Sequence, residues 1–232
     1  MSAQPAKTHL FLFDIDGTLI ASGGAGEYSM RLAVADMFGV EDGLNGVEMA
    51  GRTDHLITEN IFKKIGAQWT PERATEFLNH YLRHLAAELP RKKGRLLPGI
   101  LELLDALKTR PAVALALLTG NLERGAEIKL SHYGVWGYFE FGAYADDDCD
   151  RNRLGPFAQA RARERHGVDF PPERVFVLGD TPHDITCGRA IGAKTVAIAT
   201  GGFSREQLAA HQPDFLFDDL GDVSRVLATL GV

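Results

Sequence analysis

Apolar residues of this chain occur in short unbroken runs that alternate with longer stretches of helical periodicity. The first run, His9 to Phe13, predicts a strand buried on both faces of a parallel sheet, because a half-exposed strand alternates apolar and polar positions. Runs of the same kind return after residue 110. This alternation of strands and helices predicts an α/β fold, a Rossmann-like parallel sheet with right-handed crossovers and helices on both faces.

Turn and capping signals place the boundaries of the later elements. Glycines 134, 167 and 192 end three predicted helices, and Ser204 with Gln207 has the spacing of a capping box. The expected strands are 112–118, 139–143, 174–178, 195–199 and a short one near Phe215. The expected helices are 99–108, 123–133, 156–166, 184–191, one beginning at Ser204, and one at the end of the chain.

Helical patterns alone fill the part of the chain between the first strand and the later alternation. Helices are expected at 26–38, 54–65 and 71–89, where Thr70 is a good N-cap before Pro71 and Pro90 ends the last helix. Flexible or charged segments flank this part at both ends and indicate two hinges. We therefore expect an α/β core domain (residues 1–20 and 95–232) and an inserted helical domain (residues 21–94).

Composition narrows the possible classes of protein. The chain has 232 residues, 45% of them hydrophobic, and a net charge of −6. It can form a sizeable core, but it lacks the excess of basic over acidic residues that a protein binding duplex nucleic acid needs. Cys149 and Cys187 follow no metal-type spacing, which favours a reduced, cytoplasmic protein. No signal peptide and no apolar run near the roughly 18 residues of a membrane span are visible, so neither nucleic acid nor membrane is an expected partner. The oligomeric state stays open.

Two carboxylates follow the first predicted strand. Asp14 and Asp16 stand at its carboxyl end, which is the edge where open α/β sheets bind ligands. An Asp-x-Asp-Gly segment also occurs in turns and in calcium loops. A calcium loop counted from Asp14 requires glycine at its sixth and glutamate at its twelfth position, where this chain has Leu19 and Ala25. The spacing therefore excludes the calcium loop.

Small and hydroxyl-bearing residues accompany these acids. Gly17 lets the backbone turn closely around a bound group, and Thr18 adds a hydroxyl and an N–H group. After the strand at 112–118, Thr119, Gly120 and Asn121 offer groups suited to phosphate oxygens, although on their own they also fit a turn with an N-capping residue. These five residues are candidates for binding a substrate.

A second pair of acids follows the strand at 174–178. Asp180 and Asp184 are four residues apart, so Asp184 falls in the first turn of the next helix, where both could also serve as capping residues. Together with Asp14 and Asp16 they put four carboxylates on one edge of the sheet, where they repel one another unless a cation lies among them. Because only oxygen donors are present, Mg²⁺ is the expected cofactor.

The order of these motifs resembles that of the haloacid dehalogenase superfamily, and in particular its phosphoglycolate-phosphatase-like branch, whose helical cap is inserted after the first motif. The resemblance implies that Asp14 is the nucleophile and forms an aspartyl-phosphate. It implies that Asp16 is the acid and base and also binds Mg²⁺ through its backbone carbonyl. By the same resemblance Thr119 binds phosphoryl oxygens, and Asp180 and Asp184 complete the metal site.

One basic residue departs from the family's pattern. The family usually has a lysine before the helix that follows the third strand, and Lys129 and Lys194 both lie elsewhere in the sequence. Spacing makes Arg151 the best substitute, with Arg153 as the second choice. Arginine keeps the charge and can bind phosphate with two donors, but it is bulkier than lysine.

The inserted helical domain is expected to supply specificity. The segment 50–54 resembles the substrate-facing loop of capped relatives and offers Arg52 to an anionic group of the substrate. The same segment also fits a capped helix start with an arginine on the surface. Both interpretations stay open at this stage.

These features together predict a Mg²⁺-dependent phosphatase that acts on a small phosphorylated metabolite, such as phosphoglycolate or a sugar phosphate. A sugar phosphomutase of the same superfamily would use the same Asp14 and Asp16, and a non-catalytic phosphate-binding relative would keep the site without turnover. Dehalogenases need neither the second acid nor a metal. Asp16 and Asp180 therefore disfavour that chemistry.

Overall fold

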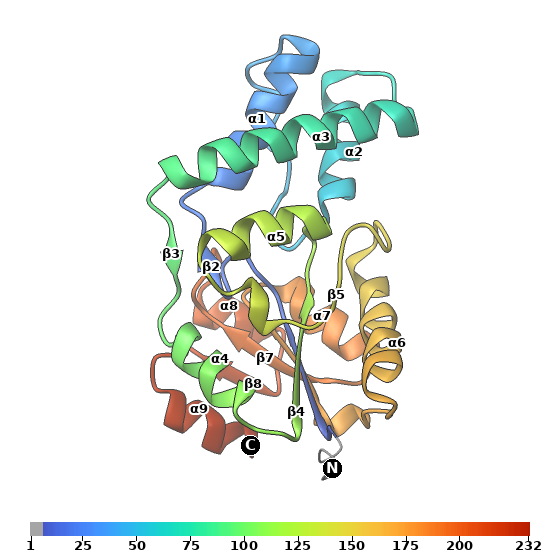
Figure 1. Ribbon diagram of the computed structural model, residues 1–232. Coiled ribbons are helices and arrows are strands. Elements are labelled where there is room, and N and C mark those ends of the chain that lie inside the picture. Colours follow the sequence, from blue (N-terminus) through green and yellow to red (C-terminus); the bar gives the residue numbers. More distant parts are fainter. Residues whose placement is uncertain (1–6) are drawn as a thin grey trace.

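A parallel sheet organises the computed structural model, which describes residues 7–232 (Figure 1). The sheet has six strands in the order β5-β4-β1-β6-β7-β8, and every neighbouring pair is parallel. The α/β fold class expected from the sequence is confirmed. In chain order the strands are β1 (His9–Phe13), β4 (Val113–Leu118), β5 (Gly142–Ala143), β6 (Val175–Gly179), β7 (Lys194–Ile198) and β8 (Phe215–Phe217).

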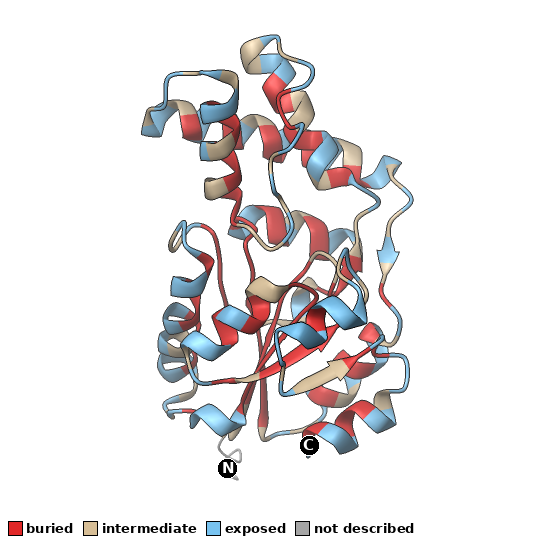
Figure 2. Cartoon of the chain, turned by 180° about the vertical axis from the view of Figure 1, so that it is seen from behind, coloured by how far each residue is buried: buried red, intermediate tan, exposed pale blue. Residues whose placement is uncertain are grey.

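Helices cover both faces of this sheet because its central strands are apolar on both sides. Phe11 and Phe13 of β1 pack on the face covered by α4 (Ile100–Lys108), α5 (Glu123–His132) and α9 (Val223–Leu230). Leu10 and Leu12 pack on the opposite face, against α6 (Leu154–His166) and α7 (Pro182–Ala190). Figure 2 shows buried residues along the strands and on the inward sides of these helices. This double burial is the reason for the unbroken apolar run in β1.

Three helices form a separate layer beyond the carboxyl ends of the strands (Figure 1). They are α1 (Ala25–Phe38), α2 (Asp54–Ile65) and α3 (Pro71–Glu88), and we call them the three-helix layer. The layer has an apolar core of its own, in which Met30, Phe62 and Phe77 are almost fully buried. As the sequence indicated, the side chain of Thr70 caps α3 by accepting a hydrogen bond from the Arg73 N–H.

A short antiparallel ribbon links this layer to the rest of the chain. β2 (Ile20–Ala21) pairs with β3 (Arg95–Leu96), so the two segments predicted as hinges run alongside each other. The division of the chain into two domains at these points stays a prediction.

Most predicted elements match the structure to within two residues, and the differences have local causes. The helix expected at 156–166 begins at Leu154 because a 3₁₀ turn leads into it. The helix expected at 184–191 begins at Pro182 because Thr181 caps it. The remaining elements are α8 (Arg205–Ala210) and four 3₁₀ helices, η1 (Leu89–Arg91), η2 (Trp136–Tyr138), η3 (Arg151–Arg153) and η4 (Pro172–Arg174).

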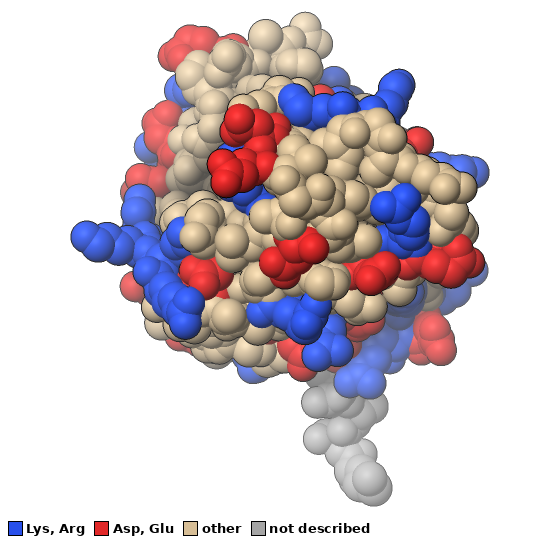
Figure 3. Space-filling view, turned by 90° about the horizontal axis from the view of Figure 1, so that it is seen from above, with Lys and Arg blue, Asp and Glu red and all other residues tan. Residues whose placement is uncertain are grey.

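The exterior carries charges of both signs. In the view onto the three-helix layer, Lys and Arg side chains alternate with Asp and Glu around the edge of the molecule (Figure 3). Within residues 7–232, none of the helices combines the length and the apolar character needed to cross a membrane.

Candidate active site

Three buried carboxylates meet at the carboxyl edge of the sheet. Asp14 follows β1, Asp180 follows β6, and Asp184 lies in the first turn of α7. Because β1 and β6 are neighbours in the sheet, their ends bring these side chains together. One oxygen from each carboxylate lies within 4.8 Å of the others, and all three residues are at least 95% buried. We call Asp14, Asp180 and Asp184 the acidic cluster.

Close backbone packing holds this cluster in place. Gly17 has a φ angle of +83°, and a Cβ atom there would overlap the Asp180 carboxylate, so both the conformation and the space require glycine. The Thr18 hydroxyl donates a hydrogen bond of 3.1 Å to Asp180 Oδ1. Gly17 and Thr18 were expected to bind substrate. In the structure both residues pack against Asp180, and their binding of substrate stays a prediction.

Arg151 is the basic residue of the cluster. Its side chain is 93% buried, and its Nη2 atom lies 2.9 Å from Asp14 Oδ1 and 2.5 Å from Asp184 Oδ1. Arg153, the second choice from spacing, is largely exposed and pairs with Asp148 instead. Asp184 also completes the helix cap, since its Oδ2 atom accepts hydrogen bonds from the N–H and the hydroxyl of Thr181. The capping interpretation and the cluster interpretation of Asp184 therefore both hold.

One arginine does not balance three buried acids. Burial raises the pKa of Asp14 to about 6, against the opposing charge of Arg151. Burial, followed by the charges of Asp14 and Asp184, raises the pKa of Asp180 well above its usual value. A donor set made only of carboxylate oxygens, with excess negative charge, fits a hard divalent cation.

We expect Arg151→Met to destabilise the protein strongly. Removing one partner of a buried ion pair leaves the carboxylates unpaired, at a cost of about 3 to 5 kcal/mol in the free energy of unfolding. Urea denaturation in EDTA at mildly alkaline pH measures this loss in the free energy of unfolding. Arg153→Met is the matched control, and as a surface change it should stay within about 0.5 kcal/mol of the wild type. Equal stability of the two variants would contradict the arrangement described here.

Asp16 turns away from the acidic cluster toward a second polar group. Its Oδ2 atom accepts hydrogen bonds from Asn121 Nδ2 at 3.0 Å and from Lys129 Nζ at 2.5 Å. Lys129 Nζ also donates to Asn121 Oδ1 at 2.6 Å. The Thr119 hydroxyl accepts from Asn121 Nδ2 at 2.9 Å, which ties Thr119 into the same network. The expected metal contact of the Asp16 backbone carbonyl stays a prediction.

Lys129 is the main residue of this network that the sequence analysis did not include among the candidates. It was excluded because it does not precede the helix after the third strand, yet its side chain is 96% buried and contacts Asp16. The sequence did hold a signal. Lys129 lies on the inward side of α5, beside the buried Ala126 and Leu130, where an apolar residue is the usual choice. Lys194, by contrast, lies at the surface and pairs with Asp214.

The loop before α2 is fixed to the carboxyl edge of the sheet. The Asp54 N–H donates to the Gly120 carbonyl at 2.7 Å, and Asp54 Oδ2 accepts from the Leu122 N–H at 2.9 Å. The Thr53 hydroxyl donates to the Cys149 carbonyl at 2.7 Å. Burial raises the pKa of Asp54 to about 6, with the nearby charge of Lys129 opposing the shift. These bonds dock the three-helix layer on the sheet.

A cavity of about 230 Å³ lies between the three-helix layer and the edge of the sheet. Arg52 is at its wall, where Nη2 pairs with Glu48 Oε2 at 2.7 Å. Among the residues expected from the sequence, the cavity is lined by Asp14, Asp16, Arg52, Gly120, Asn121 and Arg151. Its other lining residues are Ser22, Gly24, Gly26, Glu27, Met30, Met49, Ala50, Asp54, Ile57, Tyr81 and Lys129.

A parallel sheet with buried acids and an arginine at its carboxyl edge, beneath a layer of helices, is the arrangement of an α/β enzyme whose ligands bind at that edge. Residues 11–198 match the family described as haloacid dehalogenase-like hydrolase, and the chain belongs to that family. The family membership and the phosphoglycolate-phosphatase-like character inferred from the motifs are confirmed.

Several of the relatives that match over most of this chain are named as phosphatases. A probable phosphatase, IndB, from Dickeya dadantii is 26% identical, covering 92% of this chain and 91% of its own. A phosphoglycolate phosphatase from Synechococcus elongatus is 25% identical, covering 94% and 97%. The crystal structure of a predicted phosphoglycolate phosphatase from Haemophilus somnus has a TM-score of 0.71 at 21% identity, covering 94% and 97%. The chain is accordingly an enzyme of the phosphatase type within this family, a hydrolase of phosphoric monoesters.

Proposed function

We propose that this enzyme is a Mg²⁺-dependent phosphatase that hydrolyses a small phosphorylated metabolite through an aspartyl-phosphate on Asp14. The observation that carries the proposal is the acidic cluster paired with Arg151, of which Asp14 and Arg151 line the cavity beneath the three-helix layer. The cavity volume of about 230 Å³ lies below the roughly 300–1,000 Å³ of pockets for drug-sized ligands. This favours a small substrate over a nucleotide or a phosphoprotein.

The acidic cluster and the backbone carbonyl of Asp16 are the groups that would hold Mg²⁺. Three carboxylates in contact distance and an oxygen-only donor set support that choice. When bound, the ion neutralises charge on the phosphoryl oxygens and on the attacking carboxylate. In its presence the mutual repulsion of Asp14, Asp180 and Asp184 is offset.

The first chemical step is attack by a carboxylate oxygen of Asp14 on phosphorus. The bond from phosphorus to the substrate oxygen breaks, and Asp16 donates a proton to the departing oxygen. Arg151 and the Thr119 hydroxyl hold the phosphoryl oxygens during the transfer. The Nε atom of Arg151 is buried and makes no hydrogen bond to the described residues.

The second step returns the enzyme to its starting state. Asp16, now a carboxylate, takes a proton from a water molecule whose oxygen attacks phosphorus, and the bond to Asp14 breaks as inorganic phosphate forms. Lys129 and Asn121 act as positioning residues, since both donate to Asp16 Oδ2. The charge of Lys129 stabilises the carboxylate that the first step leaves on Asp16.

Lys129→Met tests this positioning role. The methionine keeps the length and the apolar stem of the side chain but removes the charge and the donor. We expect kcat to fall by about 10² -fold, at the lower end of what general acid–base catalysis contributes, while KM changes much less. Lys194→Met is the matched control because Lys194 pairs with Asp214 at the surface. Unchanged kcat in Lys129→Met would show that Asp16 works without this contact.

The wall supplied by the three-helix layer is the proposed specificity element and acts as a cap. Arg52 is held by Glu48 at the cavity, where it can bind a carboxylate or hydroxyl of the substrate. A phosphorylated hydroxy acid or sugar fits such a pair of sites, with the phosphoryl group at Arg151. The unpaired Cys149 and Cys187 support a reducing, cytoplasmic setting.

Phosphate release from a panel of metabolites tests the function. The panel includes phosphoglycolate and hexose phosphates, with Mg²⁺ present and with or without a hexose bisphosphate. A phosphatase releases inorganic phosphate from some member of the panel without the bisphosphate. Isomerisation of a hexose phosphate only when the bisphosphate is added would instead identify a phosphomutase. Phosphate binding without any turnover would identify a non-catalytic relative.

A further inference from the structure

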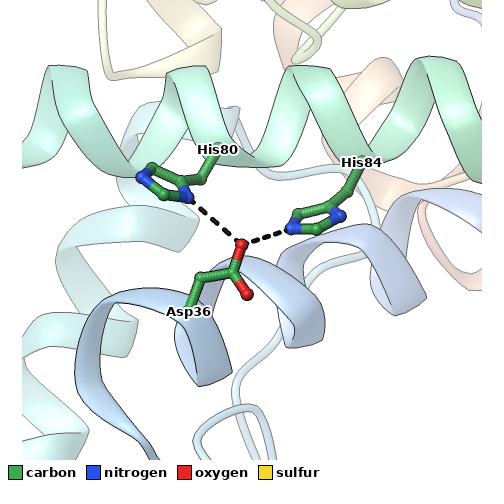
Figure 4. Close-up of side chains that lie close together, drawn as sticks. All are labelled: Asp36, His80 and His84. Atoms are coloured by element: carbon green, nitrogen blue, oxygen red, sulfur yellow. Dashed lines mark hydrogen bonds and ion pairs between the residues drawn. The ribbon is translucent and has the colours of Figure 1, made fainter.

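A cluster of metal-ligating side chains lies on the three-helix layer, outside the residues that line the cavity. Asp36 projects from the last turns of α1, and His80 and His84 project from α3 (Figure 4). Asp36 Oδ2 lies 3.3 Å from His80 Nδ1 and 2.7 Å from His84 Nε2. One ligand atom from each of the three residues lies within 4.8 Å of the others. Both rings are therefore directed at a single point between the two helices.

The donor set is unlike that of the acidic cluster. Two imidazole nitrogens and one carboxylate oxygen suit a borderline ion such as Zn²⁺, whereas Mg²⁺ prefers oxygen alone. Histidines four residues apart lie on one face of a helix and can bind the same ion, as in helical zinc sites. The nature and the spacing of these ligands both favour a transition metal.

The two distances from the imidazole nitrogens to Asp36 can be compared with those of a tetrahedral site. With metal–ligand bonds of about 2.0–2.1 Å, ligand atoms stand about 3.3 Å apart. The separation of His80 Nδ1 from Asp36 Oδ2 is 3.3 Å, so this pair needs no change. The 2.7 Å separation of His84 Nε2 from Asp36 Oδ2 must open by about 0.6 Å to reach that value. The Asp36 side chain is 44% exposed, so water can reach a fourth position.

Hydrogen bonding alone is the competing explanation. In the structure both rings contact Asp36 as hydrogen-bonded partners, and these bonds hold the pKa of the Asp36 carboxyl below its usual range. Such a contact would link α1 to α3 without any ion. The two explanations make different demands on the side chains at positions 80 and 84. Any hydrogen-bond donor can satisfy Asp36, whereas a metal site needs the lone pair of an imidazole nitrogen.

We propose that Asp36, His80 and His84 bind one Zn²⁺ ion, with water as the fourth ligand, and that the ion fastens α1 to α3. The same two helices supply part of the cavity wall, Met30 from α1 and Tyr81 from α3. Tyr81 stands between the two histidines in the sequence. The ion therefore stabilises the layer that encloses the cavity, and it takes no part in the chemistry there.

The test uses the full chain, which is stripped of metal and then supplied with excess Mg²⁺. The Mg²⁺ is added to occupy the acidic cluster before Zn²⁺ is titrated. Zn²⁺ is titrated by calorimetry, and Co²⁺ serves as a spectroscopic substitute. We expect the wild-type protein to bind one equivalent of Zn²⁺ and to show the visible absorption band of tetrahedral Co²⁺. We also expect Zn²⁺ to raise its midpoint of thermal unfolding.

Glutamine variants separate the metal site from the hydrogen bonds. His80→Gln and His84→Gln keep an amide that can donate to Asp36, so the contact between the helices survives while a ring nitrogen is lost. Each should bind Zn²⁺ at least tenfold more weakly and lose the Co²⁺ band, and His211→Gln, at an exposed position, should change neither. Equal Zn²⁺ affinity and stoichiometry in the wild type and both cluster variants, or no zinc bound by the wild type, overturns the proposal.

Discussion

Asp14→Asn will lower kcat for phosphate release by at least about 10⁴-fold, the loss expected when a covalent nucleophile is removed. The amide has nearly the shape of the carboxylate, so it fits the same buried position after β1, but it cannot attack phosphorus. The measurement is steady-state phosphate release with the fastest substrate of the panel. Thermal unfolding confirms that the variant is folded.

A matched aspartate at the surface supplies the control for this experiment. Asp169 pairs with Arg163, and both side chains are about two-thirds exposed. Exposed pairs contribute little to stability, so Asp169→Asn should keep the kcat and the unfolding midpoint of the wild type. If Asp14→Asn also kept its activity, Asp14 would not be the nucleophile and the proposed mechanism would be wrong.

Removal of divalent metal will have the second large effect. Dialysis against EDTA should lower kcat by at least about 10³-fold, because the charge that the ion stabilises in the transition state then goes uncompensated. Added Mg²⁺ should restore the activity. Asp180→Asn removes one carboxylate from the acidic cluster and should demand far more Mg²⁺ for half-maximal activity.

Stability gives an independent measure of the same site. Mg²⁺ should raise the thermal unfolding midpoint of the wild type by binding to the folded state, and it should raise that of Asp180→Asn much less. The Asp169→Asn protein should respond to Mg²⁺ as the wild type does. Full activity of the wild type in EDTA would rule out the metal-dependent mechanism.

The acidic cluster could be anticipated because it depends on sheet topology. Parallel strands end at the same edge, so acids that follow β1 and β6 meet there whatever the remaining chain does. The strand pattern and the motif order were therefore enough to predict that Asp14, Asp180 and Asp184 lie together. Spacing ranked Arg151 above Arg153, and the structure adds the contacts that separate them, since Arg151 reaches Asp14 and Asp184 whereas Arg153 pairs with Asp148.

Residues that join distant elements escaped the sequence analysis. Lys129 reaches Asp16 across 113 positions of the chain, and Asp54 binds the Leu122 N–H across 68. Neither contact follows from a local pattern, because each depends on how the three-helix layer and α5 pack on the sheet. The hydrogen bond from the Thr18 hydroxyl to Asp180 likewise spans 162 positions, and the expected binding of substrate by Thr18 stays a prediction.

For the cluster of Asp36, His80 and His84, too, the sequence shows one part and only the packing of the helices shows the other. The spacing of the two histidines is visible in the sequence, but Asp36 lies 44 positions before His80. Only the packing of α1 against α3 brings the carboxylate to the rings (Figure 4). A pair of histidines four apart is by itself no metal site, and the third ligand comes from the fold.

Trapping the phosphorylated enzyme with Asp16→Asn tests the role of Asp14 as nucleophile without intermediate assumptions. This variant lacks the base for the second step, whereas p-nitrophenyl phosphate has a leaving group that needs no proton for the first. With Mg²⁺ present, we expect a burst of nitrophenolate equal to the enzyme concentration, and borohydride reduction of the quenched protein should convert the residue at position 14 to homoserine. Nitrophenolate release without a burst, or a reduced residue at any other position, would show that Asp14 does not form the phosphorylated intermediate.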